Sequence, residues 1–164
     1  MAAKVNFPYG WANGIAIRGV PIINTYANNV YYVHSGTGSN TGNSGKTQAK
    51  PFATVTAALA KCTDSKCDII LLMPGHAETV ASAAAIAINK IGVQIVGLGS
   101  GNLRPTFTFA TDTAATITVT AANVGISNCI FVNTKDSLVT GISITAAGCE
   151  IKGCTFTYTS TNDA

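Results

Sequence analysis

The chain has 164 residues, of which 47% are hydrophobic and 10% are charged, and its formal net charge is +3. This length predicts one domain with a substantial core, because roughly 100–150 residues is the commonest domain size. Disorder is excluded, since disordered chains are rich in charge and poor in β-branched residues, whereas 14 of the 59 residues from Thr106 onward are threonine. A membrane span is excluded too, because aliphatic runs such as residues 69–73 are far shorter than the ~18 residues that a spanning helix needs.

The distribution of charge limits the classes of binding partner, and the cysteine content indicates the redox compartment in which the protein is made. The ten basic residues are scattered singly along the chain, and nucleic-acid binding requires a cluster that produces a field. We therefore expect no nucleic-acid partner and no membrane partner. The odd number of cysteines argues against a disulfide scaffold and favours buried thiols in a protein made in a reducing cytoplasm. The five are Cys62, Cys67, Cys129, Cys149 and Cys154.

Residues 1–29 contain no helical or alternating pattern long enough to predict an element, and we interpret them as an extended arm. The arm is too apolar for a solvated tail, and aromatic anchors are typical of protein interfaces. Two interpretations stay open: the arm anchors the chain to a partner, or it folds back over the open end of its own domain. The candidate anchoring residues are Phe7, Tyr9, Trp11, Ile15, Ile17, Val20, Ile22 and Tyr26.

Residues 30–80 are predicted to be an ordered unit with one short helix. A strand over residues 30–33 precedes a polar loop rich in Gly, Ser and Asn. Thr54 is a suitable N-cap for a helix over residues 55–62, in which apolar residues fall on one face. A buried strand is then expected over residues 68–73, where Pro74 and Gly75 end it.

Residues 81–164 contain a repeat. Residues 117–131 align with residues 142–156 at an offset of 25 without a gap, and seven of the fifteen positions are identical. A weaker copy begins at Ile86, at an offset of 31, and an insertion around residues 99–105 accounts for the extra length. Within each copy apolar residues alternate with Thr, Ser, Asn or Lys, which predicts short strands with one buried face.

Short strands at a period near 25 residues predict an all-β fold in which successive coils stack ~4.8 Å apart, a parallel β-helix. In-register stacking disfavours like charges above one another, which explains the low charge. The competing architecture is a sandwich of antiparallel hairpins. It requires Asn-Gly or Asp-Gly turns between strands, and none occurs after residue 80.

Several motifs carry a resemblance to a known family. They are YYVHSGTG at residues 31–38, NSG at 43–45, KPFATV at 50–55, PGHAET at 74–79, and IVGLG at 95–99 leading to RPT at 104–106. The chain from residue 30 to 164 resembles phage-encoded, pectate-lyase-like, right-handed, single-stranded parallel β-helix proteins. The resemblance implies a virion structural protein, commonly a homotrimer. Some relatives cleave polysaccharide, and others carry the fold without activity.

One pair of carboxylates is a candidate polysaccharide-cleaving site, because glycosidic cleavage uses two suitably spaced acids. Asp112 and Asp136 precede equivalent positions of the repeat and are expected near one another on adjacent coils. Turn capping is the favoured interpretation, because no aromatic sugar-binding platform accompanies the pair. We therefore expect no catalytic residue.

The remaining polar motifs are also interpreted as structural. Cys62 and Cys67 lack the second ligand pair of a zinc site, and Cys62 is expected on the buried helix face. His76 and Glu78 are expected on one face of a strand as a hydrogen-bonded structural pair. Cys129 is expected to stack on Cys154 in the core. No metal ligand and no cofactor-binding residue is predicted.

The expected function is that of a non-enzymatic bacteriophage virion protein, a capsid decoration or cement protein. It is assembled in the host cytoplasm and bound to the major capsid protein or another virion protein through residues 1–29. The alternative is a tail spike, or its N-terminal fragment, with depolymerase activity on host polysaccharide. A carbohydrate-binding module without hydrolysis is a third hypothesis. The sequence ends without a helix or charged cap after the last repeat, so we expect either a longer natural chain or another subunit over the last coil.

Overall fold

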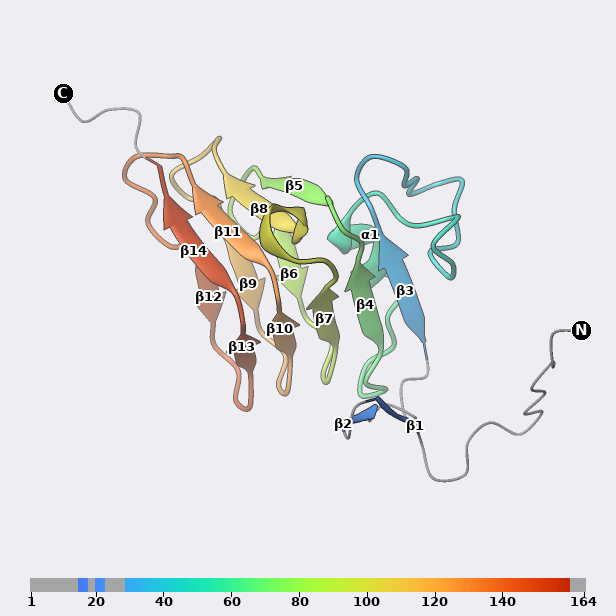
Figure 1. Cartoon of the computed structure of the whole chain (residues 1–164). Coiled ribbons are helices and arrows are strands. Elements are labelled where there is room, and N and C mark those ends of the chain that lie inside the picture. Colours follow the sequence, from blue (N-terminus) through green and yellow to red (C-terminus); the bar gives the residue numbers. More distant parts are fainter. Residues whose placement is uncertain (1–14, 18–19, 23–28, 160–164) are drawn as a thin grey trace, which may run out of the picture.

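The computed structural model describes residues 15–17, 20–22 and 29–159. Apart from one α-helix and one 3-10 turn, the regular elements described are strands (Figure 1). The helix is α1 (Val55–Leu59) and the 3-10 turn is η1 (Gly101–Leu103). The strands are β1 (Ile15–Ile17), β2 (Val20–Ile22), β3 (Val30–Val33), β4 (Ile69–Leu72), β5 (Ala77–Val80), β6 (Ile86–Ile88), β7 (Gln94–Gly97), β8 (Thr106–Phe109), β9 (Ile117–Val119), β10 (Gly125–Ser127), β11 (Ile130–Asn133), β12 (Ile142–Ile144), β13 (Glu150–Lys152) and β14 (Thr155–Tyr158).

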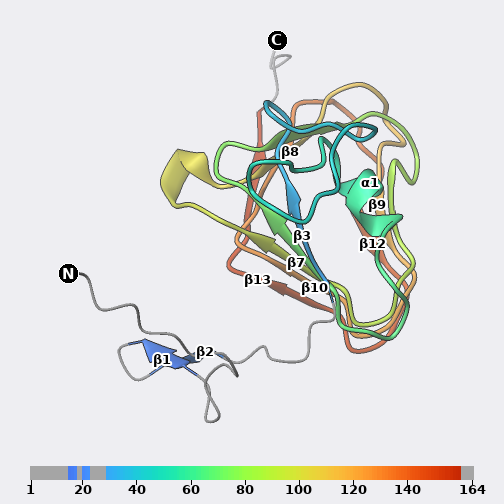
Figure 2. The ribbon, with the colours of Figure 1, turned by 90° about the vertical axis from the view of Figure 1, so that its right-hand side faces the viewer.

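Strands β3 to β14 form three parallel sheets. Their strand orders are β13-β10-β7-β4-β3, β14-β11-β8-β5 and β12-β9-β6. From β4 onward the chain visits the three sheets in the same rotation, so each turn of the chain contributes one strand to each sheet. In the view along the stack the successive turns overlie one another (Figure 2). The all-β prediction is therefore confirmed, and the pairing is parallel.

The repeat predicted the register of the last turns correctly. Ile126 pairs with Ile151 and Phe131 with Phe156, both at an offset of 25. Ile86 pairs with Ile117 at the offset of 31. The six extra residues of that turn include η1, at the predicted insertion. In-register pairing places like side chains over one another, which is why isoleucine and phenylalanine recur at the same positions.

The corners of the turns explain why asparagine and glycine replace each other in the repeat. Gly92, Asn123 and Gly148 are equivalent positions with φ of 79°, 59° and 70°. Among non-glycine residues, asparagine is one of the few that tolerate this left-handed conformation. The three copies of the repeat therefore supply Gly or Asn at this corner, whereas the equivalent residue of the preceding turn is Cys67, with φ of 54°.

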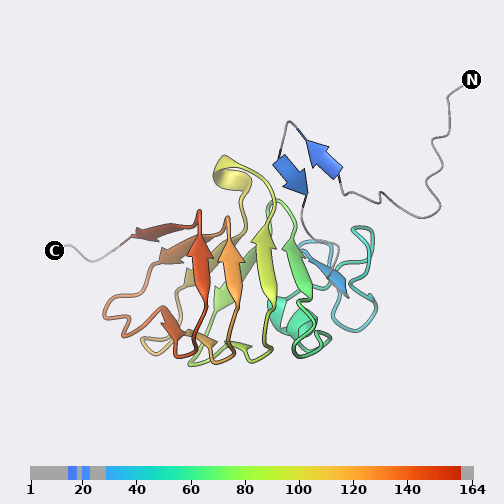
Figure 3. The same cartoon turned by 90° about the horizontal axis from the view of Figure 1, so that it is seen from below.

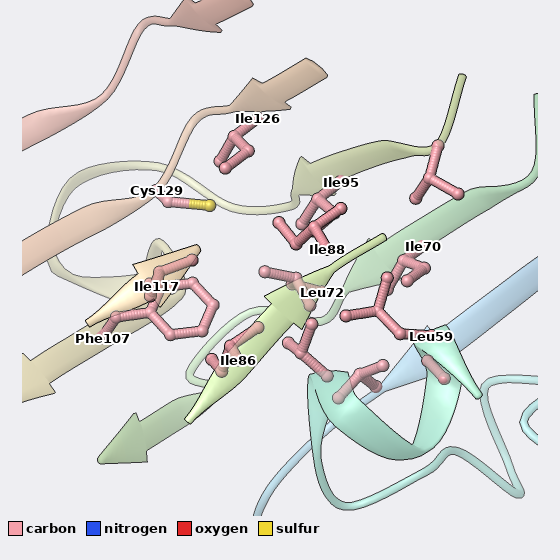
Figure 4. Packing of buried hydrophobic residues seen from close by; sticks show 14 of the residues in the cluster. Leu59, Ile70, Leu72, Ile86, Ile88, Ile95, Phe107, Ile117, Ile126 and Cys129 are labelled. Carbon is pink, nitrogen blue, oxygen red and sulfur yellow. The ribbon is translucent and has the colours of Figure 1, made fainter. Parts of the chain in front are cut away.

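The core lies between the three sheets and is filled by the inward-facing residue of each alternation. Figure 4 shows aliphatic side chains of the five-stranded and three-stranded sheets packed together with Phe107 of the four-stranded sheet. The rings of Phe107, Phe131 and Phe156 stack along the molecule, with centroid separations of 5.5 Å and 5.0 Å. Burial of these apolar faces stabilises the stack, since no single turn can bury its own face.

The predicted unit over residues 30–80 supplies the first strands of two of the sheets. Thr54 is the N-cap of α1 and its side chain accepts a hydrogen bond from the backbone of Ala57, as expected. The helix ends at Leu59, earlier than predicted, yet Cys62 is still buried. Beyond Leu59 the Lys61 and Cys62 amides still donate to the Ala58 carbonyl, and the next amide, of Thr63, donates to the Asp68 carboxylate at 2.7 Å. Helix α1 lies against β3, β4 and β6 at the N-terminal end of the stack (Figure 3).

Candidate functional site

The predicted anchoring arm is described only in part. Strands β1 and β2 pair antiparallel, with Ile15 opposite Ile22 and Ile17 opposite Val20. A short ribbon within residues 1–29 is thus a feature that the sequence did not predict, because each strand is only three residues long. The other predicted anchors, Phe7, Tyr9, Trp11 and Tyr26, lie outside the described residues.

Asp112 and Asp136 lie on loops of adjacent turns, as predicted, and these loops are joined by the Val139 amide, which donates to the Thr113 carbonyl at 2.9 Å. The Asp112 carboxylate accepts a hydrogen bond from the Ala114 amide at 2.9 Å, which is a turn cap. The Asp136 carboxylate accepts one from the Tyr158 hydroxyl at 2.9 Å. Asp112 therefore caps a turn, as the favoured interpretation expects, whereas the Asp136 hydrogen bond reaches a side chain of the next turn.

His76 and Glu78 form a structural pair in the N-terminal turns. His76 is buried, and its Nδ1 accepts a hydrogen bond from the Ser35 amide at 3.1 Å. Its Nε2 lies 3.3 Å from Glu78 Oε2 without aligning for a hydrogen bond, so the two residues are adjacent but the predicted hydrogen bond between them is not formed. Glu78 Oε2 accepts instead from the Val55 amide at 2.9 Å, at the amino end of the helix. The pair joins two adjacent turns to α1 and leaves no face of the imidazole open to a substrate.

Asp68 is a buried polar residue whose role the sequence did not reveal. Its carboxylate accepts hydrogen bonds from the Asn29 amide at 2.9 Å and from the Thr63 amide at 2.7 Å, and contacts the Asn29 side chain as well. The sequence feature that could have indicated this role is an acidic residue directly before an apolar strand. A buried carboxylate is stable only when hydrogen-bonded in this way, so Asp68 fixes the start of β3 to the loop after α1.

The cysteines are all free thiols. Cys62 is buried, as predicted, but it lies beyond the end of α1 and not on a helix face, and Cys67 is exposed. Burial raises the pKa of the Cys62 thiol to about 12, and the negative charge of Asp68 adds to this effect. Burial also raises the pKa of Cys129 to about 12, with the neighbouring Cys154 contributing second. Such thiols stay protonated at neutral pH and behave as small apolar core residues.

The C-terminal end of the stack carries an exposed apolar surface. Phe156 and Tyr158 are 61% and 60% exposed, although Phe131, the counterpart of Phe156 in the preceding turn, is 2% exposed. An open hollow of about 480 Å³ lies at this end. It is lined mainly by apolar residues, among them Phe109 of β8 and, from the last two turns, Leu138, Ile142, Ile144, Ile151 and Phe156. The uncapped end predicted from the sequence is thus present among the described residues.

Comparisons with protein-family models, with curated proteins and with solved structures found no match for this chain. The described helices include none that is long and apolar enough to cross a membrane. Within the described ranges, no group of three or more His, Cys, Asp or Glu side chains is placed to hold a metal ion. The class that the fold defines is an all-β protein of stacked parallel sheets.

Proposed function

We propose that the three sheets form a right-handed, single-stranded parallel β-helix. The cyclic order in which the chain visits the sheets supports a continuous coil with three strands per turn. Connections between parallel strands of one sheet are right-handed in about 98% of known cases, because of the twist of the strands. The resemblance of residues 30–164 to phage β-helix proteins points to the same handedness.

The protein serves as a non-enzymatic structural component of a bacteriophage virion, a capsid decoration or cement protein. The observation that carries this proposal is that the polar groups best suited to chemistry have structural partners. His76 is enclosed between Ser35 and Glu78, and Asp112 caps its own turn. A stack of in-register turns offers a rigid body with extensive surface, and such bodies add buried area when they bind across subunits of a shell.

Attachment to the major capsid protein or another virion protein occurs through residues 1–29. Aromatic side chains dominate the binding energy of protein interfaces, and the arm concentrates Phe7, Tyr9 and Trp11 within five positions. The ribbon of β1 and β2 is only two strands wide, and an isolated ribbon of that width is marginally stable in water. Docking on a partner supplies the missing surface.

The homotrimer implied by the family resemblance uses the outer face of the five-stranded sheet. Alternation directs one residue in two of each strand away from the core. At the N-terminal end of this sheet those outward residues are apolar and only half-buried. They are Val30, Tyr32, Ile69, Leu71 and Val96. Lateral packing of three chains removes this surface from water.

Particle binding tests the attachment. Capsids lacking the protein are incubated with the full chain, with a variant deleted for residues 1–28, and with Trp11→Ala; Asn13→Ala is the matched control in the same arm. Loss of a buried Trp anchor weakens binding by about 2 kcal/mol or more, so occupancy falls for Trp11→Ala and the deletion but not for Asn13→Ala. Unchanged occupancy of the deletion variant contradicts anchoring through the arm.

A tail-spike depolymerase is the second candidate, and one contact favours it. Tyr158 is an exposed aromatic residue hydrogen-bonded to Asp136, and aromatic faces beside carboxylates are typical of sugar-binding sites. A reducing-sugar assay on host polysaccharide separates the two functions. Release of oligosaccharide that Asp112→Asn or Asp136→Asn abolishes would establish the enzyme and refute the structural role.

A further inference from the structure

The two ends of the stack differ in how their strand edges are covered. At the N-terminal end the edge of β3 is occupied, because Tyr32 and His34 donate backbone hydrogen bonds to Gly45 and Phe52 at 2.7 Å and 2.8 Å. Helix α1 packs beside this edge. At the C-terminal end β12, β13 and β14 are each the last strand of a sheet, and within the described residues no strand pairs with their outer edges. Figure 3 shows these strands at the opposite end from α1.

The exposed edge of β13 has a sequence that is complementary to itself. It reads Glu150-Ile151-Lys152, with both charged side chains exposed and Ile151 packed against the core. If two such strands pair antiparallel with Ile151 opposite Ile151, each Glu150 lies opposite a Lys152. Opposite charges directly across two strands stabilise the pair, and like charges destabilise it. Two ion pairs therefore form at once, with no unmatched charge.

A two-fold axis through Ile151 also brings the other apolar residues of the C-terminal end of one copy against those of the second copy. Such an axis lies in the plane of the end and exchanges the other two edges, so that β14 of each copy faces β12 of the other. Phe156 and Tyr158 of one copy then lie over Ile142 and Ile144 of its partner. All four residues line the apolar hollow of about 480 Å³. The two hollows close on one another, and the exposed aromatic rings leave water.

We infer that the C-terminal end binds the C-terminal end of a second copy of this chain, in a two-fold symmetric pair. A head-to-tail arrangement is disfavoured because the N-terminal edge is already covered. A two-fold pairing is closed, since each copy offers the same surface and no edge remains to propagate a fibre. Every assembly that contains this pairing has an even number of chains: two, or six where lateral trimers also form.

Sedimentation equilibrium on the full chain measures the association. The wild type is compared with Glu150→Lys, with Lys152→Glu, and with the double exchange Glu150→Lys plus Lys152→Glu; Lys66→Glu, in an exposed loop after α1, is the charge-matched control. Each single reversal turns two attractive pairs into two repulsive ones and raises the dissociation constant by about 10-fold or more. The double exchange restores the pairing, because each introduced lysine then faces an introduced glutamate of the partner strand.

The outcomes separate clearly. An even-numbered wild type, weakened by both single reversals, rescued by the double exchange and unaffected by Lys66→Glu, supports the inference. A wild type that stays monomeric or trimeric at high concentration overturns it, whether the end is covered by another partner or by the arm. An even-numbered assembly that responds to none of the β13 variants also overturns it. Circular dichroism of each variant verifies that the turns remain folded.

Discussion

The phenylalanine ladder offers a matched pair of substitutions that tests how the stack is stabilised. Phe131 and Phe156 are equivalent residues of neighbouring turns, paired in register, with ring centroids 5.0 Å apart. They differ in exposure, which is 2% for Phe131 and 61% for Phe156. Truncating each to alanine therefore removes the same atoms from two environments that differ mainly in burial.

The expected costs differ several-fold. Phe131→Ala loses the transfer free energy of a buried ring and leaves a cavity between Phe107 and Phe156, which costs about 3–5 kcal/mol. Phe156 has only about two-fifths of its surface buried in one chain. Its truncation leaves no enclosed cavity, so the cost is about 1 kcal/mol, from a full burial value of roughly 3 kcal/mol.

Equilibrium unfolding in urea, followed by circular dichroism at concentrations where the chain sediments as a monomer, measures both values. A loss of 3–5 kcal/mol is a large part of the 5–15 kcal/mol typical of a folded domain, so the shift in midpoint is readily resolved. Equal costs for the two variants in the monomer would refute the reasoning. In the end-to-end pair Phe156 becomes buried, and its cost then rises with protein concentration.

Two further predictions follow from the turns and the thiols. Asn128 holds φ of 56°, and its side-chain amide donates to the carbonyls of Gly97 and Gly99 at 2.9 Å and 3.1 Å. Asn128→Ala loses both hydrogen bonds and strains the corner, which lowers the free energy of unfolding by about 3 kcal/mol. Asn128→Gly loses only the hydrogen bonds, at a cost of about 2 kcal/mol. A thermal unfolding experiment in which the glycine variant is less stable than the alanine variant contradicts this account. The thiols of Cys62 and Cys129 have pKa values raised from 9.0 to about 12. Because the unfolded chain ionises its thiols first, the stability that these groups contribute is intact below about pH 9 and falls as the pH rises toward 12. Urea unfolding midpoints between pH 8 and 10.5 measure this fall in stability, which is smaller in Cys129→Ala. In a separate test at pH 8, a disulfide reagent labels Cys67 but not the two buried thiols. Equal labelling of all three thiols is the contrary result.

Much of the fold was predictable because the turns repeat. The offset of 25 residues alone predicts the register of β10 with β13 and of β11 with β14. In-register stacking favours the same residue type at equivalent positions, so similar residues at a fixed offset identify the strands that pair with one another. The alternation of apolar residues likewise indicates which side chains face the core.

The N-terminal unit was less predictable, since nothing in it repeats. The apolar pattern predicts a helix as far as Cys62, and the helix ends at Leu59. Beyond it the Thr63 amide bonds to the Asp68 carboxylate and not to a helix carbonyl. The burial of Asp68 and the enclosure of His76 depend on contacts with residues about forty positions away. Local sequence pattern carries no information about such partners.

The sequence by itself determined the all-β class, the parallel stacking implied by the repeat, and the low charge that in-register strands require. The tertiary structure alone decided which polar side chains have hydrogen-bond partners and which strand edges are unpaired among the described residues. Phe131 and Phe156 are equivalent in sequence, yet one is core and the other is surface, because the turn that would cover Phe156 is not among the described residues. The burial of a residue depends on whether another turn packs against it, and its position within the repeat does not specify this.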